Sequence, residues 1–246
     1  MQKRQLIPAG IIVPAAEQRA LEEVFVLSKR RIKFTKLGMA KFISHLDLLR
    51  TFTRSVTRSG LPVKYSNGFN PHQIITFSLP LSVGVTSESE YVDIDFDDCA
   101  TNEEIMEKLR SALPPDMRVL NVGYPEISAN DICAAEYVIE FFEVGFTEEK
   151  LRAFFDEKEL PVIKKTKKGE KEVNLKEFIK SYEIIEITET YAKMKIALSA
   201  GGSENIKPSV FTAKLLDYMN EDPEARVYPH RTEIFYLSGK EMKNFC

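Results

Sequence analysis

The chain has 246 residues, of which 43% are apolar and 29% are charged, and its formal net charge is −3. This length allows one large domain or two domains of about 100–130 residues each. No apolar run approaches the roughly 18 residues of a membrane-spanning helix, so we predict no membrane span. Because the net charge is negative, any binding of nucleic acid must use a local basic surface.

Three cysteines, Cys99, Cys133 and Cys246, are widely separated in the chain. They form no CxxC pair and no Cys/His pair at the spacing of a zinc site. The sequence also lacks the P-loop, GxGxxG, GxSxG and HExxH motifs. We therefore predict no metal site and no cofactor.

The first residues, 1–29, contain a short apolar patch that is broken by two prolines. This pattern lacks the continuous apolar region of a secretion signal. We interpret the segment as an N-terminal leader that need not be ordered, and we expect a cytoplasmic protein.

The following hundred residues predict the element order β-α-β-β-α-β. A strand at 31–36 alternates charged and apolar residues. Ser44 is the expected N-cap of a helix that ends at Gly60, with Asp47 placed as in a capping box. The remaining predicted elements are a short strand at 63–65, turn chemistry at 66–71 (SNGFNP), alternating segments at 75–81 and 92–96, a helix capped by Asn102 that runs to about Leu113, and a strand at 117–122.

This pattern predicts which side chains of the first helix are buried and which side chains near the strand at 92–96 face solvent. The helix after Ser44 is expected to bury an apolar stripe that includes Leu46 and Phe52. Asp93, Asp95 and Asp97 alternate with apolar residues and are expected to face solvent.

The order of elements repeats after a predicted linker at 128–134. Thr147 is expected to cap a helix through about Glu157, and Pro208 to start another. The other predicted elements are a strand at 137–142, a basic hairpin at 162–173, strands at 183–187 and 191–198, and a closing strand at 226–236. We predict an α+β fold of two tandem ferredoxin-like (βαββαβ) units with antiparallel sheets, one at 30–127 and one with the basic hairpin at 128–246.

An arginine row is the first candidate for a functional surface. Arg50, Arg54 and Arg58 recur every four residues and share one stripe of the first helix. Guanidinium groups at this spacing suit a row of phosphates. The alternative is a solvated outer face of an amphipathic helix.

The turn after the helix is the second candidate. Tyr65, Phe69, Asn70 and His72 flank its glycine. Aromatic rings beside exposed backbone N–H groups can stack on bases and hold phosphate. The same residues can instead fix the corner of a hairpin.

The basic hairpin is the third candidate. Lys164, Lys165, Lys167 and Lys168 make it too basic for a core position. They can contact backbone phosphate or protect an exposed strand edge from aggregation. A further basic cluster, His230 with Arg231, lies near the C-terminus.

His45 and His72 are the candidates for catalysis. A general acid or base in a metal-independent ribonuclease needs one or two such groups. This alternative requires that both histidines line one cleft. A partly buried, hydrogen-bonded His45 would instead be structural.

The string FISHLDLLR, followed by SGLPVKYSNGFNPHQIITFSLPLSVGV and SEYVDI, resembles the signature of the radical SAM-linked proteins, a bacterial family also catalogued as a domain of unknown function. The resemblance runs from about Arg31 to the end, with thinner support in IKPSVFTAKLL and HRTEIFY. It implies a companion of a B12-binding-type radical-SAM enzyme in an RNA or ribosome context. It carries over no catalytic residue.

The predicted function is a non-catalytic, RNA-binding accessory module that works with a separate radical-SAM enzyme in RNA modification or ribosome-related metabolism. One alternative is a metal-independent ribonuclease or RNA-modifying enzyme that uses His45 or His72. The other is a protein-binding adaptor for the radical-SAM partner.

Overall fold

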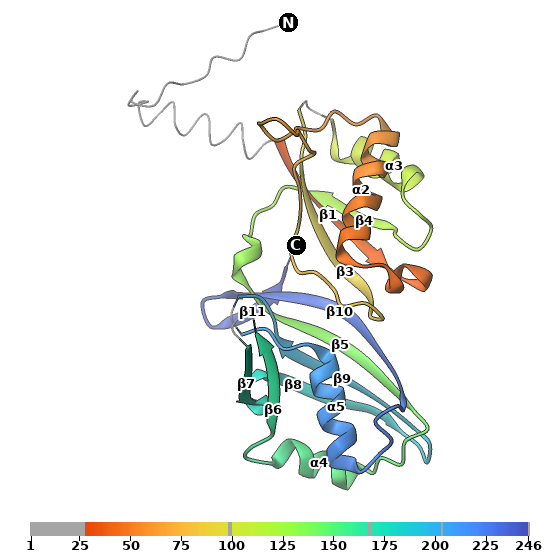
Figure 1. Ribbon diagram of the computed structural model, residues 1–246, viewed down its shortest axis with the longest axis vertical. Helices are drawn as coiled ribbons and strands as arrows, with labels where there is room; N and C mark the ends of the chain where they lie inside the picture. Colours follow the sequence, from red (N-terminus) through yellow and green to blue (C-terminus); the bar gives the residue numbers. More distant parts are fainter. Residues whose placement is uncertain (1–27, 98–99, 167–168, 203, 246) are drawn as a thin grey trace, which may run out of the picture.

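The computed structural model describes residues 28–97, 100–166, 169–202 and 204–245 (Figure 1). The leader predicted for residues 1–29 lies outside these ranges except at its end, where Lys29 already begins a strand. The first half of the chain contains β1 (Lys29–Lys36), the 3-10 helix η1 (Gly38–Phe42), α2 (His45–Ser59), β2 (Ile75–Phe77), β3 (Thr86–Asp95), α3 (Asn102–Ala112) and β4 (Val119–Gly123).

Local sequence explains the ends of these helices. The Ser44 hydroxyl accepts the Asp47 amide at 3.2 Å, which confirms the predicted N-cap of α2. Gly60 ends α2 in the left-handed region, with φ of 66°, where a side chain would be strained. Thr101, and not the predicted Asn102, caps α3, because its hydroxyl accepts an amide of the first turn.

The second half contains η2 (Ala129–Asp131), β5 (Ile132–Phe142), α4 (Glu148–Asp156), β6 (Pro161–Thr166), β7 (Gly169–Asn174), η3 (Leu175–Phe178), β8 (Ile179–Ile187), β9 (Tyr191–Ser199), α5 (Pro208–Met219), β10 (Arg226–Ser238) and β11 (Glu241–Asn244). Thr147 caps α4 and Pro208 opens α5, as predicted. The segment 128–134 is not simply a linker, because Ile132 and Ala134 are buried in the first residues of β5.

Nine of the described strands form one mostly antiparallel sheet in the order β4-β1-β3-β10-β5-β9-β8, with β2 added at β3 and β11 at β10, and β6 and β7 pair as a separate hairpin. The predicted pair of separate antiparallel sheets is therefore corrected. The strands of the first half (β1–β4) and those of the second half (β5 and β8–β11) join where β3 pairs with β10 in parallel, at Thr86 with His230 and at Ser87 with Arg231. This pairing covers an edge of each set that would otherwise expose unpaired backbone groups.

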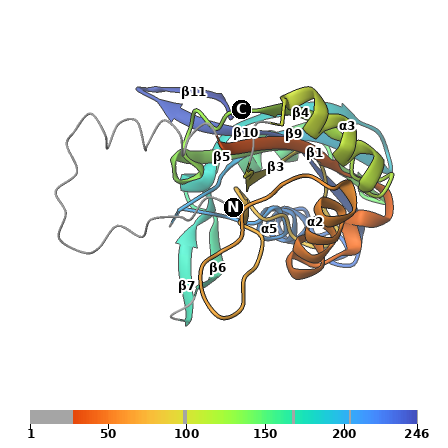
Figure 2. The same ribbon diagram turned by 90° about the horizontal axis from the view of Figure 1, so that it is seen from above.

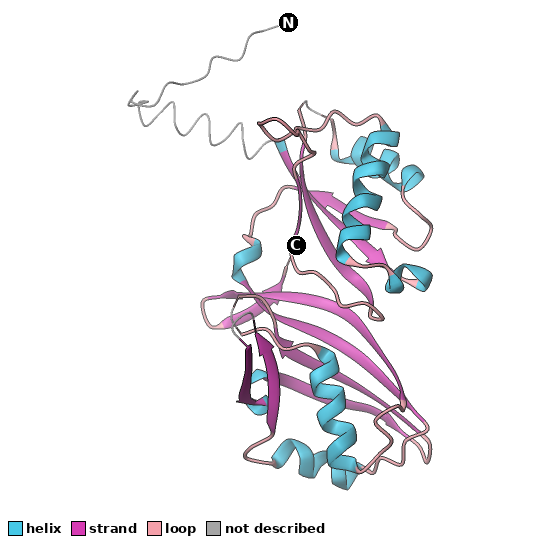
Figure 3. Cartoon of the chain, in the orientation of Figure 1, coloured by secondary structure: helices cyan, strands magenta, loops and turns pink. Residues whose placement is uncertain are grey.

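Helices α2 and α5 lie on the same side of this sheet, and hairpin β6–β7 extends toward that side (Figures 2 and 3). Two hydrophobic clusters form the interior. One contains Phe34 and Phe52 in the first half, and the other contains Phe141, Phe154 and Phe211 in the second. None of the helices in the described ranges is long and apolar enough to cross a membrane.

Two side chains differ from the predicted orientation. Asp95 was expected to face solvent, but it is 1% exposed, and its Oδ1 lies 3.7 Å from Lys29 Nζ. Leu46 was expected in the apolar stripe of α2, but it is 63% exposed. The buried face of α2 is centred on Leu48 and Phe52, and Leu46 lies outside that arc.

Candidate nucleic-acid interface

The N-terminal part of α2 holds Arg50 on the surface. Its Nη1 lies 3.0 Å from Asp47 Oδ1, and both side chains are exposed. Hydrogen bonding from the Ser44 hydroxyl, and then from Arg50, lowers the pKa of Asp47. The Asp47 carboxylate thus holds Arg50 beside the first turn of the helix.

Arg54 lies one turn further along the exposed face of α2. Within the described ranges, no hydrogen bond or ion pair occupies its guanidinium group. A guanidinium that makes no internal hydrogen bond keeps all its donors for a ligand such as phosphate.

Arg58 has a different position from the other two arginines. Its Nη2 donates to the carbonyl oxygen of Ala112 at 2.7 Å and to the hydroxyl of Ser55 at 3.0 Å. The cation therefore lies at the C-terminal end of α3, where the helix dipole favours positive charge. All three arginines of the predicted row are exposed, but only Arg58 also joins two helices.

The turn after α2 is held in shape by its own hydrogen bonds. The Ser66 amide donates to the His72 carbonyl at 2.8 Å, and the Ser66 hydroxyl lies 2.9 Å from His72 Nδ1. Gly68 adopts a φ of 126°, which only glycine takes up without strain. Phe69, at the tip, is fully exposed at 106%, and Tyr65 is half-exposed.

A hydrogen bond attaches this turn to α2. Gln73 Nε2 donates to Thr57 Oγ1 at 3.0 Å. Arg54 precedes Thr57 by three residues, so the two side chains are neighbours on the helix surface. Gln73, which directly follows the Tyr65–His72 turn, therefore lies beside the part of α2 that carries Arg54.

The two candidate histidines lie near opposite ends of α2. His45 is its first residue, and its ring centroid is 5.4 Å from that of Phe77. His72 is next to Gln73, which contacts Thr57, twelve residues further along the helix. At 1.5 Å per residue this separation is about 18 Å. The structure therefore does not assemble one cleft from both histidines.

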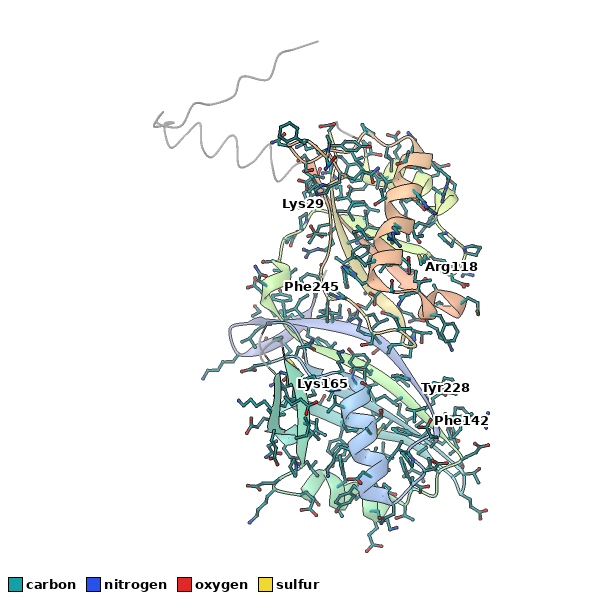
Figure 4. The ribbon with its side chains drawn as sticks, viewed as in Figure 1. Lys29, Arg118, Phe142, Lys165, Tyr228 and Phe245 are labelled. Atoms are coloured by element: carbon teal, nitrogen blue, oxygen red, sulfur yellow. The ribbon has the colours of Figure 1, made fainter. Side chains whose placement is uncertain are left out.

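The basic hairpin β6–β7 lies in the half of the molecule away from α2, as the position of Lys165 in Figure 4 shows. Lys165 Nζ is 3.8 Å from the Glu170 carboxylate, and Lys164 Nζ is 4.9 Å from the ring centroid of Phe178. Lys167 and Lys168 lie outside the described residues. The hairpin β6–β7 does not lie beside the Tyr65–His72 turn.

The predicted basic cluster at the C-terminus is not a surface cluster. Arg231 is 1% exposed and forms an ion pair with Glu90, which is also buried. Sequence reasoning missed this buried pair. Its one visible signal is that charged residues, among them Lys36, occupy strand positions that periodicity assigns to the interior.

Comparison with known proteins gives a family and a fold. A sequence model of a family described as "uncharacterized protein conserved in bacteria (DUF2344)" matches residues 29–208. No curated protein matches the chain. Among solved structures, a chain of a Cbf5–Nop10–Gar1 complex is similar, with a TM-score of 0.50 and 12% identity over 86% of this chain and 50% of that chain.

Two further solved structures are similar at lower scores. A chain from an H/ACA RNP bound to a substrate RNA containing 2′-deoxyuridine has a TM-score of 0.46 and 10% identity, over 88% of this chain and 49% of that chain. A chain of the archaeal box H/ACA sRNP Nop10–Cbf5 complex has a TM-score of 0.43 and 13% identity, over 86% and 48%. The present chain thus spans about half the length of the solved chains that it resembles.

Proposed function

We propose that this chain, which belongs to that family of uncharacterized bacterial proteins, is an RNA-binding accessory module whose contact surface is formed by α2 and the Tyr65–His72 turn. The observation that carries the proposal is the position of Phe69. A fully exposed aromatic ring on a hydrogen-bonded turn contributes little to folding. Its face is available for stacking on an unpaired base.

The charges around this ring support the same function. Arg54 and Arg50 are exposed on the helix to which the turn is attached. Both can contact phosphates of an RNA strand that runs along α2 to the turn. The chain as a whole has a net charge of −3, so these cations form a local site on a mildly acidic molecule.

We further propose that 30–127 and 128–246 are two tandem ferredoxin-like domains. In each half the α-helices and strands follow the order β-α-β-β-α-β, apart from the inserted hairpin β6–β7 and the final strand β11. The first strand of each set, β1 or β5, lies between the third and fourth strands of that set. This strand order is the one that the ferredoxin-like fold requires, and it supports the assignment.

The proposed partner is a separate radical-SAM enzyme, acting with the chain in the cytoplasm on RNA modification or ribosome-related metabolism. This part of the proposal depends on the signature that includes Ser44–Arg50 and Tyr65–His72. Affinity purification of the chain from its native host tests it. Recovery of both RNA and such an enzyme is expected, whereas recovery of the enzyme without RNA would identify a protein adaptor instead.

The direct test of RNA binding is a titration of fluorescent single-stranded RNA at several salt concentrations. The Arg50→Gln/Arg54→Gln double variant should bind roughly tenfold more weakly. The slope of log K against log salt should fall by about 1.4, or about 0.7 for each lost phosphate contact. A matched control, Lys150→Gln/Arg152→Gln, removes two exposed cations from α4. Equal affinities in all three proteins would refute the proposed surface.

A further inference from the structure

The strand β8 ends the sheet on the side of the second half. It pairs with β9 along one edge, and in the part of the chain that the structure describes no strand pairs with its other edge. An antiparallel strand directs alternate N–H and C=O groups away from its partner, so the outer edge of β8 presents a row of unpaired backbone groups. The strand at the opposite end of the sheet, β4, is shorter, and Arg110 Nε donates to its Val119 carbonyl oxygen at 2.9 Å.

A groove runs along this edge of β8. Its volume is about 490 Å³, and it is lined by six consecutive residues of the strand, 182–187, and by Glu148 and Arg152 of α4. Pockets of roughly 300–1,000 Å³ are typical of ligand sites. A lining of six consecutive strand residues suits an extended chain, because such a chain advances by the same step per residue as β8 itself.

The side of the groove that faces the helices is apolar. The Tyr182 ring stacks on Phe155 of α4 with 3.6 Å between centroids. Ile184 and Ile187 pack against the hydrophobic cluster of the second half. Ile185 lies at a break in the register with β9 and is 45% exposed. An extended segment in the groove would therefore contact apolar side chains on this side.

The opposite face of β8 is acidic. Glu183 lies in register with Lys195, and its carboxylate is 3.7 Å from that ammonium group. Glu186 lies in register with Lys193, but Lys193 pairs with Glu140 at 3.4 Å, and Glu186 forms no ion pair with a described residue. Three carboxylates and one guanidinium line the groove, which is an excess of two negative charges. This face therefore favours basic side chains.

Charged side chains and bulges also keep an edge strand from pairing with other chains. Two observations favour a binding site over protection of the edge. Tyr182 and Ile185 are 39% and 45% exposed, so apolar surface lies directly beside the unpaired backbone groups. The groove also leaves space along the strand that an approaching backbone can fill.

We propose that the outer edge of β8 binds an extended segment of a partner protein as an added strand, and that the side chains of this segment alternate between apolar and basic. Backbone hydrogen bonds to the edge supply affinity, and the alternating contacts supply specificity. The apolar side chains lie beside Tyr182, Ile184 and Ile187. The basic side chains lie beside Glu183 and Glu186. The site belongs to the second half of the chain and does not depend on RNA binding by α2.

Titration of the full chain against a fluorescent ten-residue peptide that alternates valine and lysine tests this site by anisotropy. One control peptide replaces lysine with glutamate. A second keeps the valine–lysine side chains and carries a methyl group on every backbone amide, which removes the donors that an added strand needs. Both controls should bind at least roughly tenfold more weakly than the valine–lysine peptide. No binding of that peptide, or equal binding of the methylated form, would overturn the proposal.

A matched pair of variants places the binding at β8. Ile185→Lys adds a cation to this edge and should weaken binding of the valine–lysine peptide roughly tenfold. Leu120→Lys adds the same cation to β4, at a position of similar exposure, and should leave the affinity within twofold. The bound peptide should also slow hydrogen exchange of amides in residues 182–187 and not in 119–123. Equal weakening by both variants, or slowed exchange confined to other strands, would contradict the assignment.

Sedimentation of the chain without peptide separates the proposed partner from a second copy. The wild type and Ile185→Lys should have the same mass in solution. A wild-type dimer that Ile185→Lys converts to a monomer would assign the edge of β8 to another copy of the chain and would overturn the proposal.

Discussion

Gln73 Nε2 donates to Thr57 Oγ1 at 3.0 Å, and this bond fixes the stem of the Tyr65–His72 turn against α2. Gln73 is buried and Thr57 is exposed, so the bond lies at the edge of the interior. The turn and the helix are therefore joined, and both present exposed side chains, among them Phe69 and Arg54.

Phe69→Ala should separate binding from folding. Because the ring is fully exposed, its removal should change the free energy of unfolding by less than about 0.5 kcal/mol. Loss of one stacking contact should weaken binding of single-stranded RNA by about 1–3 kcal/mol. Chemical denaturation and RNA titration measure the two quantities. Leu237→Ala, which truncates an exposed residue of β10, is the control and should leave RNA affinity unchanged.

Arg58→Gln should lower stability and leave RNA binding unchanged, which is the reverse of the expectation for Phe69→Ala. The variant loses the hydrogen bond to the Ala112 carbonyl that joins α2 to α3, and the expected loss of stability is about 1 kcal/mol. RNA affinity should stay within twofold of wild type, whereas Arg54→Gln should reduce affinity and leave stability unchanged. If Arg58→Gln weakens RNA binding as much as Arg54→Gln does, the distinction between these two arginines is wrong.

The junction of the two halves should weaken in acid. Burial lowers the pKa of His230, against the opposing effects of Glu88 and Glu140, and its Nδ1 lies 2.8 Å from the Thr86 hydroxyl. The unfolded chain then binds this proton more readily than the folded chain does. Stability from His230 is thus present above its unfolded pKa and is lost as pH falls through the lower folded value.

Denaturation curves between pH 7.5 and pH 5 check this expectation. In His230→Gln the pH dependence of stability should be shallower than in the wild type, with the two curves converging at the acid end. Parallel curves over the whole range would show that His230 does not couple protonation to folding.

Arg231→Met should be among the most destabilising single changes in the protein. It leaves the Glu90 carboxylate buried without its cation, and removal of one partner from a buried pair costs about 3–5 kcal/mol. Adding Glu90→Gln should recover a large part of this loss, because no unpaired charge then remains. Urea denaturation of the two variants measures the difference; equal stabilities would contradict the buried pairing.

Elements set by local chemistry could be predicted from the sequence. Ser44, Thr147 and Pro208 mark helix starts because the capping hydroxyl or the fixed proline φ acts within a few residues. The pairing of β3 with β10 could not be predicted, since it joins Thr86 to His230 across 144 positions. It depends on two strand edges that exist only after each half has folded.

The same reason explains which exposed positions the sequence predicts. Helical spacing placed Arg50 and Arg54 on one face, and turn chemistry at Gly68 indicated the exposed Phe69. Spacing alone also grouped Arg58 with them, because the acceptor on α3 is remote in sequence. Burial of Arg231 with Glu90 depends on a contact between residues 141 positions apart, so the sequence alone groups Arg231 with His230 as a basic cluster.

Photocrosslinking of the purified full chain to bound single-stranded RNA, followed by mass spectrometry of the crosslinked peptides, tests the central claim most directly. We predict crosslinks within Tyr65–His72, at Tyr65 and Phe69, and their loss in the Arg50→Gln/Arg54→Gln variant. Crosslinks confined to the strands of the second half, with none between residues 45 and 77, would contradict the proposed interface.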